Sequence, residues 1–418
     1  MPKLTDEEWT YGRSLTFSER VHITLVFLRL PFALLINCVK AAFFRPDGIG
    51  FQRAVVHSTI RYLNHHISIP EMQALSLLSV PTYIRWAKKM KMKVTVEDLV
   101  EDTKIMWIGP KRNDKVVLWV HGGAYIAPLV EPALNLYMYL QAELAMGGCD
   151  VGIAVLGYTI IPDAGFPTQI HQLTVAVQHL LATGLHPSNL HIIGDSAGGN
   201  IILSFLSHLL HPLPSLRNIS PSYIKSSLPS SSSTSISSIP LVAPIRGIYL
   251  LSPWVTMRST SNSYNSDAPN DLISKRNLDV FADIVLSHIG KCLGRPTTEH
   301  ENAMHYLDPL NCPEGWWDGL GTVVDRVLVS AGSEELLSDD IVKFADEILA
   351  KADSSASATR KAEVTLVVQD GGVHGDPLMD FVMGPKKGGE MHNVGSLTPV
   401  IVRWLKEGMK LRNDTADS

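Results

Sequence analysis

The sequence predicts an α/β protein with a mostly parallel central sheet and helices on both faces. The run Val116–Val120 is continuously apolar, which is typical of a strand buried on both faces of a parallel sheet. Strand-like and helix-like segments then alternate as far as residue 410, which favours a doubly wound arrangement. With 418 residues, 45% of them hydrophobic and 18% charged, the chain can bury a large core.

The elements follow from the periodicity of apolar residues. Residues 1–85 have helical spacing, whereas 93–99 and 104–108 alternate like the strands of an antiparallel edge. Further strands are predicted at 116–120, 151–156, 190–193, 247–251, 326–330 and 363–368. Helices are predicted at 132–146, 168–182, 198–210, 339–352 and 396–410.

Two segments interrupt this alternation. Residues 212–244 are rich in serine and proline and predict a flexible surface loop. Residues 258–320 are rich in Asn, Pro and Trp, and we interpret them as an irregular insertion over the carboxyl edge of the sheet. Together with the helical segment 1–85 this insertion would form a cap on a domain spanning 86–410, which is followed by a tail, 411–418.

Charge and cysteine content exclude several classes of protein. The 36 Lys and Arg residues are outnumbered by 41 Asp and Glu, giving a net charge of −5, so the chain lacks the basic excess of a nucleic-acid binder. The four cysteines lie far apart and form no CxxC pair, which predicts neither a disulfide framework nor a zinc site. This pattern favours an intracellular location, in the cytoplasm or at the endoplasmic-reticulum membrane.

One long apolar stretch near the N-terminus needs a separate interpretation. Residues 21–44 are apolar but contain Arg29, Pro31 and Lys40, and the polar leader before them is a poor secretory signal. A charge near the centre of a spanning helix is unfavourable, which favours an amphipathic helix that covers the globular domain. The alternative is a membrane anchor or an interfacial helix made by the same residues.

The strongest local motif is a candidate nucleophile elbow. Gly194-Asp195-Ser196-Ala197-Gly198 follows an apolar strand and precedes an apolar helix, which is the context that a G-x-S-x-G motif requires. The glycines allow a tight turn against neighbouring backbone, so that the hydroxyl of Ser196 stands at its tip. Ser196 is therefore the candidate nucleophile.

A second motif would stabilise negative charge on a substrate oxygen. The strand Val116–Val120 ends in His121-Gly122-Gly123, and successive glycines let backbone N–H groups approach an oxygen closely. The predicted oxyanion donors are the amides of Gly122, Gly123 and Ala197. His121 is expected to hold the shape of the loop rather than to act as a base.

The base and the acid are chosen by chain order, which is serine, acid and histidine in sheets of this kind. His374 lies in a glycine-rich loop after the last core strand, whereas His392 follows no strand and His305 lies in the insertion. The loop after the strand near residue 330 contains Glu334 and Glu335, and either could orient the imidazole. We favour Glu335 and keep Glu334 as the alternative.

These motifs together resemble the hormone-sensitive-lipase-like branch of the α/β-hydrolases, over roughly residues 85–410. Further stretches are similar to that branch: Tyr158-Thr159-Ile160-Ile161-Pro162 with Phe166-Pro167, then Ser252-Pro253-Trp254, and Gly332 to Asp340 with its glutamate. The serine-rich insertion and polar leader resemble fungal members, which include steryl acetyl hydrolases and esterases of secondary-metabolite clusters. Ala124 replaces the third glycine of the family's HGGG loop.

The resemblance implies an α/β-hydrolase fold with a helical cap and a serine carboxylic-ester hydrolase without a metal or cofactor. Its expected substrate is a short- or medium-chain acyl ester, such as an acetyl ester, of a hydrophobic alcohol. Tyr125 and Trp254 are expected to line the substrate pocket, with Trp316 and Trp317 as further candidates. The alternatives are a lactonase, amidase or acyltransferase with the same triad, or a non-catalytic small-molecule receptor.

Overall fold

A computed structural model describes most of the chain. It covers residues 14–44, 50–213, 241–266, 271–289, 298–353, 360–382, 395 and 397–410, and the structural statements concern these residues. Nearly all of the predicted serine-rich loop, the tail and His392 lie outside the described residues.

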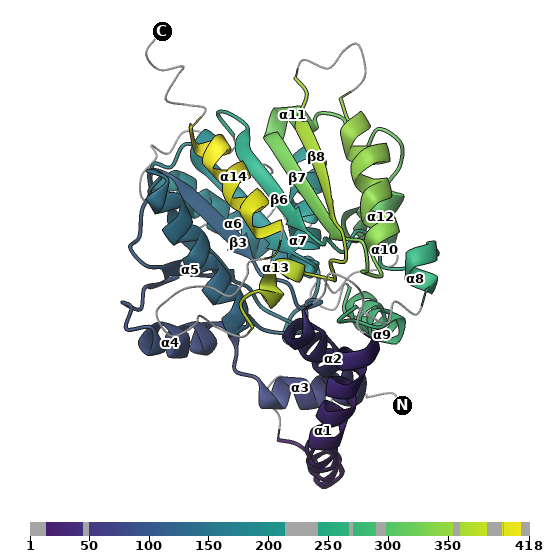
Figure 1. Cartoon of the computed structure of the whole chain (residues 1–418). Coiled ribbons are helices and arrows are strands. Elements are labelled where there is room, and N and C mark those ends of the chain that lie inside the picture. Colours follow the sequence, from purple (N-terminus) through teal and green to yellow (C-terminus); the bar gives the residue numbers. More distant parts are fainter. Residues whose placement is uncertain are drawn as a thin grey trace.

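The core of the structure is a single eight-stranded sheet, and the predicted α/β class is confirmed (Figure 1). The strand order is β1-β2-β4-β3-β5-β6-β7-β8. Of the described strands only β2 runs antiparallel to the rest, because its pairings with β1 and with β4 are both antiparallel, and the alternating edge segments predict such an antiparallel edge. The strands are β1 (Val96–Asp98), β2 (Lys104–Ile108), β3 (Val116–Val120), β4 (Gly152–Gly157), β5 (Leu190–Asp195), β6 (Ile245–Leu251), β7 (Val324–Gly332) and β8 (Glu363–Gln369).

The two faces of the sheet bury two hydrophobic clusters. Because successive side chains of a strand point to opposite faces, Leu118 of β3 joins one cluster while Trp119 joins the other. Helices α4 (Ser79–Lys89), α5 (Glu131–Met146) and α14 (Leu397–Lys410) cover the Trp119 face. The opposite face is covered by α6 (Thr168–Ala182), α7 (Ala197–Leu210), α10 (Thr298–Leu307), α11 (Leu320–Val323) and α12 (Ser338–Lys343).

The insertion at 258–320 is more regular than the sequence analysis expects. It contains α8 (Asn262–Asn265), α9 (Lys275–Ser287), α10 and η4 (Pro309–Asn311). Helix α9 begins at a capping box between Ser274 and Asn277, and it buries Leu278, Ala282 and Val285 at helical spacing. The prediction of irregular structure is therefore wrong. It rests on the Asn, Pro and Trp content of the whole segment, in which the helical spacing of these three apolar residues is not evident.

The single helix predicted at 339–352 is also divided. Helix α12 continues into a π-helical turn, η5 (Phe344–Ile348), and a 3₁₀ turn, η6 (Leu349–Lys351). The remaining short elements are η1 (Pro187–Asn189) and α13 (Asp376–Met379), which follows the last strand.

Three N-terminal helices, α1 (Phe17–Phe44), α2 (Phe51–His66) and α3 (Ile69–Leu75), gather at the end of the molecule where α9 lies (Figure 1). Helix α2 is fixed to the domain by the Arg53 guanidinium, which contacts Asp376 and lies 2.7 Å from Asp380 Oδ1. These contacts join α2 to the segment that follows the last strand.

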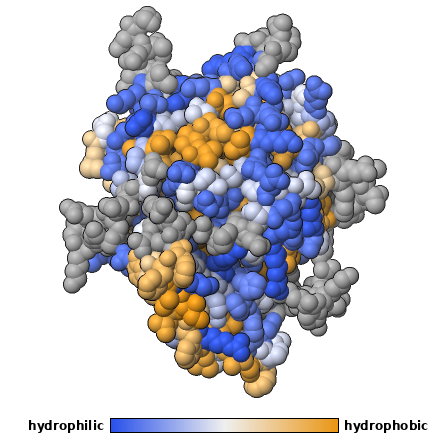
Figure 2. Space-filling model, turned by 45° about the vertical axis from the view of Figure 1, so that its right-hand side comes forward, coloured by the Kyte–Doolittle hydropathy of each residue, from blue (hydrophilic) through white to orange (hydrophobic). Residues whose placement is uncertain are grey.

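Helix α1 does not cover the globular domain, so that prediction is wrong. Of its described residues only Ile23, Val26 and Ala41 are buried, whereas Phe32 is 70% and Phe43 is 77% exposed. Figure 2 shows hydrophobic side chains on the surface at this end of the molecule. Among the described helices, α1 is long and apolar enough to cross a membrane by length and composition.

The start of α7 packs so closely on β3 that a methyl group would not fit there. A Cβ atom at Gly198 would overlap the carbonyl oxygen of Val120. Gly198→Ala should therefore lower the free energy of unfolding by about 3 kcal/mol, as overpacking against backbone does. Gly50→Ala is the matched control, because a methyl group there meets no atom of the described residues within 4 Å. Equal denaturant midpoints for the two variants, measured by tryptophan fluorescence, would contradict this account.

Candidate active site

Ser196 stands on a tight turn between β5 and α7. Its backbone has φ 52° and ψ −119°, a strained conformation that residues other than glycine seldom adopt. The strain is held by hydrogen bonds from the Ser196 N–H to Leu251 O, at 2.9 Å, and from the Trp254 N–H to Ser196 O, at 3.1 Å. The Ser196 side chain is half-buried, so its hydroxyl lies at the surface of the carboxyl edge of the sheet.

The structure brings three predicted residues together from distant parts of the chain. Ser196 Oγ lies 2.8 Å from His374 Nε2, close enough to donate a hydrogen bond to the imidazole. On the other side of the ring, His374 Nδ1 lies 3.2 Å from Glu335 Oε2. Hydroxyl, imidazole and carboxylate therefore follow one another in the order that a nucleophile, its base and an orienting acid require.

The two glutamates take different positions. Glu335 is 1% exposed and directs its carboxylate toward His374, whereas Glu334 is half-buried and its backbone N–H donates to Gly372 O. The 3.2 Å contact is long for a charge-assisted hydrogen bond, which usually measures about 2.7–2.9 Å. Such contacts often tighten only when substrate is bound.

Burial and charge act in opposite directions on this group. Burial lowers the pKa of His374, but the contact with Glu335 and the nearby carboxylates of Asp271 and Asp195 outweigh it, so the pKa is raised above 6.5. Burial raises the pKa of Glu335, and the neighbouring imidazole partly opposes that effect. The pair thus favours a proton on the imidazole, which is what a base needs when it accepts one.

The loop after β3 differs from the prediction at Gly122. The Gly122 N–H donates to Asp195 Oδ2 at 3.0 Å, so it is already engaged and does not serve as a free oxyanion donor. The next residues, Gly123, Ala124 and Tyr125, all have positive φ, which turns the chain sharply over the serine. Among the described residues, no acceptor is found for the N–H groups of Gly123, Ala124 and Ala197.

His121 has the structural role that the sequence predicts. Its ring stacks on Tyr158 with centroids 4.4 Å apart, and its nitrogens lie 3.1 Å from Ser79 Oγ and 2.8 Å from Gly122 O. Burial lowers the pKa of His121 to about 4, so the ring is neutral near pH 7. It holds the loop after β3 and lies outside the serine–imidazole pair.

The residues expected to line a substrate pocket lie in the core instead. Tyr125 is 1% exposed and donates its hydroxyl to Asn200 Oδ1 at 2.7 Å, while Trp254 is 2% exposed. Neither side chain offers surface to a substrate, which corrects that expectation. Trp317 packs on Phe344 and is also buried. Trp316 stacks on His211 and donates to Ser207 Oγ, so both tryptophans serve packing.

Two residues that hold the His374 loop were missed by the sequence analysis. Ser252 Oγ accepts a hydrogen bond from the Gly375 N–H at 3.0 Å, and Asp271 Oδ1 accepts one from the His374 N–H at 3.0 Å. Ser252 belongs to the Ser-Pro-Trp turn, which the sequence analysis identifies without assigning a role to the serine. Asp271 lies in the insertion, and no motif marks it.

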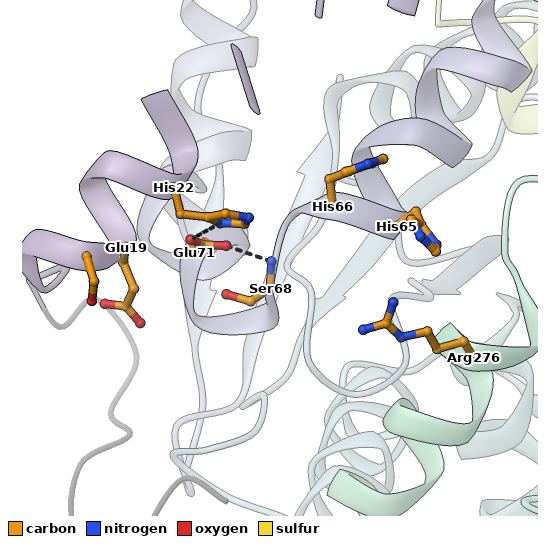
Figure 3. A pocket seen from close by; sticks show the side chains of 8 residues that line it. Glu19, His22, His65, His66, Ser68, Glu71 and Arg276 are labelled. Atoms are coloured by element: carbon orange, nitrogen blue, oxygen red, sulfur yellow. Dashed lines mark hydrogen bonds and ion pairs between the residues drawn. The ribbon is translucent and has the colours of Figure 1, made fainter. Parts of the chain in front are cut away.

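The structure holds a surface cavity away from this group. It measures about 450 Å³ and lies between α1, α2, α3 and α9 (Figure 3), and its lining includes no residue of the serine–imidazole–carboxylate group. Among the described residues, no cluster of three or more His, Cys, Asp or Glu is placed to hold a metal ion.

Comparison with known proteins agrees with this geometry. The alpha/beta hydrolase fold family matches residues 117–376, well over half of the chain. The chain belongs to this family. Two solved structures are similar to it: an esterase from the bacterial hormone-sensitive lipase family and an esterase/lipase from an uncultured bacterium. Each match covers 91% of this chain and 98% of the chain in the solved structure. At 20% and 18% identity, with TM-scores of 0.50 and 0.51, they show the same fold.

Curated relatives of this hydrolase extend the comparison. The protein mug81 of Schizosaccharomyces pombe, which carries the name of a steryl acetyl hydrolase, is 23% identical over 273 residues, covering 63% of this chain and 62% of mug81. An esterase of Acinetobacter venetianus is 25% identical over 233 residues, covering 56% and 61%. An acetyl-hydrolase of Streptomyces hygroscopicus is 32% identical over 114 residues, covering 26% and 36%. The hydrolase thus spans less than two thirds of the length of each relative.

The two glutamates can be separated by the reactivity of the serine. Glu335→Gln should slow labelling of Ser196 by a fluorophosphonate by about 100-fold or more, because the amide can hold the wrong imidazole tautomer. The matched variant Glu334→Gln should label within about twofold of the native rate, since the contact with the imidazole is made by Glu335. Labelling rates are read by intact-protein mass spectrometry. The reverse order of the two variants would assign the acid to Glu334.

Proposed function

We propose that this hydrolase is a serine carboxylic-ester hydrolase that acts on short acyl esters, acetyl esters above all, of a hydrophobic alcohol. The observation that carries the proposal is the 2.8 Å approach of Ser196 Oγ to His374 Nε2, with Glu335 buried behind the ring. A half-buried, strained serine beside a base, with nearby amides that have no acceptor among the described residues, is suited to attack on a carbonyl carbon.

In the first half-reaction, Ser196 Oγ attacks the ester carbonyl and His374 Nε2 takes the hydroxyl proton. Glu335 stabilises the resulting imidazolium, which is why its burial beside His374 matters. The carbonyl oxygen becomes an oxyanion that the amides of Gly123, Ala124 and Ala197 would bind. When the tetrahedral intermediate collapses, the C–O bond to the alcohol breaks and the imidazolium protonates the leaving oxygen.

The second half-reaction repeats these steps with water. His374 takes a proton from the water, whose oxygen attacks the carbonyl of the acylated Ser196. The same amides receive the second oxyanion, and collapse releases the carboxylic acid and returns the proton to Ser196 Oγ. No other group is required to balance either step.

The acetyl preference and the hydrophobic alcohol are supported by the relatives. The names of the S. pombe and Streptomyces proteins describe acetyl hydrolases, and the name of the S. pombe protein specifies a steryl ester. A lactonase, an amidase and an acyltransferase would use the same acyl-enzyme and differ in the leaving group or the acceptor. A non-catalytic receptor would not need a strained serine within bonding distance of an imidazole.

The test is hydrolysis of p-nitrophenyl acetate, butyrate and decanoate by the native chain, Ser196→Ala and Ser204→Ala. We expect the acetate to give the highest kcat/KM, and Ser196→Ala to lose about four orders of magnitude or more in kcat. Ser204→Ala is the matched control, because its buried hydroxyl donates to Tyr306 O about two turns along α7 from Ser196, and the substitution should leave turnover unchanged.

Three outcomes would overturn parts of the proposal. No turnover by the native chain would favour the receptor, and turnover that survives in Ser196→Ala would place the chemistry elsewhere. A steryl acetate, a γ-lactone and an anilide are then compared with the native chain. Faster cleavage of the lactone or anilide than of the steryl acetate would change the substrate class.

A further inference from the structure

Helix α1 carries an apolar stripe that no described part of the chain covers. The stripe consists of exposed side chains at spacings of three and four, so they share one face of the helix: Val21, Leu25, Leu28, Phe32, Leu35, Val39 and Phe43. A continuous exposed apolar surface of this kind marks a site of contact with another apolar phase.

The opposite face of α1 is committed to the protein. Ile23, Val26 and Ala41 are buried there, and His22 Nδ1 lies 2.7 Å from Glu71 Oε1 of α3 (Figure 3). Glu71 is itself buried and also accepts a hydrogen bond from the Ser68 N–H. Helix α1 is therefore held against its neighbours by packing and by a hydrogen bond with a fixed partner.

Helix α2, on which α1 packs, is bound to the catalytic domain through polar groups. Arg53 contacts Asp376 and Asp380, and Arg61 donates to the backbone oxygen of Asp271 at 2.9 Å. A helix with such partners cannot enter hydrocarbon without losing them, because unpaired charges are unfavourable there. Helix α1 can thus present one face to a bilayer but cannot be surrounded by it.

Charge on α1 points to the surface of a membrane. From Val21 to Phe44 the charged residues are Arg29 and Lys40, both positive and both exposed, and the spacing places them beside the stripe. Long basic side chains beside an apolar face reach the headgroup region while their stems stay in apolar surroundings. With 28 residues the helix is about 42 Å long, which exceeds the roughly 30 Å hydrocarbon core.

We propose that α1 lies in the plane of a membrane surface, with its apolar stripe in the lipid and Arg29 and Lys40 against anionic headgroups. The protein would then be held on one side of the bilayer by a half-immersed helix. Because α1 packs on α2, and Arg53 of α2 contacts Asp376 two residues after His374, the site would stand near the lipid from which a hydrophobic ester would come.

The first test is sedimentation of the full chain with phosphatidylcholine vesicles, with or without phosphatidylserine. The native chain should bind, and phosphatidylserine should strengthen binding about tenfold or more. The variant Leu28→Asp with Phe32→Asp and Leu35→Asp should not bind. A matched triple variant, Val130→Asp with Met146→Asp and Val242→Asp, changes exposed apolar residues outside α1 and should bind like the native chain. Equal binding by both triple variants, or none by the native chain, would overturn the proposal.

A second measurement separates a helix in the plane from one that spans. Nitroxide labels are placed singly at Val21, Phe32 and Phe43, and their depth is measured by power saturation with vesicles. An in-plane helix gives three similar, shallow depths, because all three positions lie on the stripe. A spanning helix would bury the label at Phe32 far deeper than the two near the ends, and that result would overturn the in-plane arrangement.

A second inference concerns Asp271, a buried carboxylate in the insertion, and it rests on the proposed function. Its Oδ1 accepts from the His374 N–H at 3.0 Å, and its Oδ2 accepts from the Leu336 N–H at 2.9 Å. Leu336 follows Glu335 directly in the chain. One side chain, 1% exposed, therefore holds the loop of the base and the loop of the acid at a fixed separation.

We infer that Asp271 is a positioning residue that sets the imidazole against the Glu335 carboxylate. Each carboxylate oxygen of Asp271 accepts a hydrogen bond from a backbone N–H, one in each loop, and a side chain with a single acceptor oxygen cannot do both. In Asp271→Asn the amide oxygen can accept from one loop only, and the amide nitrogen then meets the N–H of the other. The two loops would separate while the serine, imidazole and glutamate all remain in the chain.

Asp271→Asn should lower kcat on p-nitrophenyl acetate by about 10- to 100-fold with KM nearly unchanged, as expected for a misplaced group. The matched control is Asp353→Asn, because that buried carboxylate also accepts from two backbone amides, those of Gly319 and Gly321, away from the serine. Both variants are compared by thermal unfolding. An equal kcat loss in the two variants would reduce Asp271 to a structural role.

The pH profile gives a readout that a structural role would not move. The groups facing His374 are Ser196, Glu335, Asp271 and Asp195, and the charge of Asp271 helps to keep the pKa of His374 raised. Removing that charge should move the acid limb of the kcat/KM profile to lower pH. An unmoved limb with native kcat would overturn this inference while leaving the proposed function intact, whereas an inactive native chain would overturn the proposed function itself.

Discussion

The geometry of the site depends on the buried carboxylate of Asp195. It accepts hydrogen bonds from the Trp119 indole at 2.9 Å and from the Gly122 amide at 3.0 Å, and so it ties the end of β3 to the turn after β5. Burial raises the pKa of Asp195, and these two hydrogen bonds oppose that effect. Because Ser196 is the next residue, the same link fixes the hydroxyl relative to the Gly123 and Ala124 amides, for which no acceptor is found among the described residues.

Local patterns account for the part of the fold and site that could be predicted. The run Val116–Val120 and the turn around Ser196 are specified by adjacent residues, so a strand–turn–helix unit can be identified without knowing its neighbours. His374 follows from chain order and from its glycine-rich loop. The register between Glu334 and Glu335 is different, because it depends on how Gly332 packs against Gly372 of another loop.

Other features could not be predicted because they exist only after folding. The Gly122 amide turns to Asp195 rather than toward a substrate, and Tyr125 and Trp254 are drawn into the core around Asn200. Asn200 donates to the backbone oxygens of Trp254 and Leu307 and accepts from Tyr125. No spacing in the sequence signals that one asparagine satisfies groups from three distant segments.

The attachment of α2 has a practical consequence for work with shortened forms of the chain. Removing the apolar N-terminal helices up to α4 would make the protein easier to purify, but it would also remove Arg53 and Arg61. Asp376 and Asp380, which follow the His374 loop, would then lose the Arg53 guanidinium as their counter-charge. The backbone oxygen of Asp271 would lose its hydrogen bond from Arg61. The site of a shortened chain would therefore be expected to differ from the site of the full chain. Replacing the outward side chains of α1 keeps that scaffold intact.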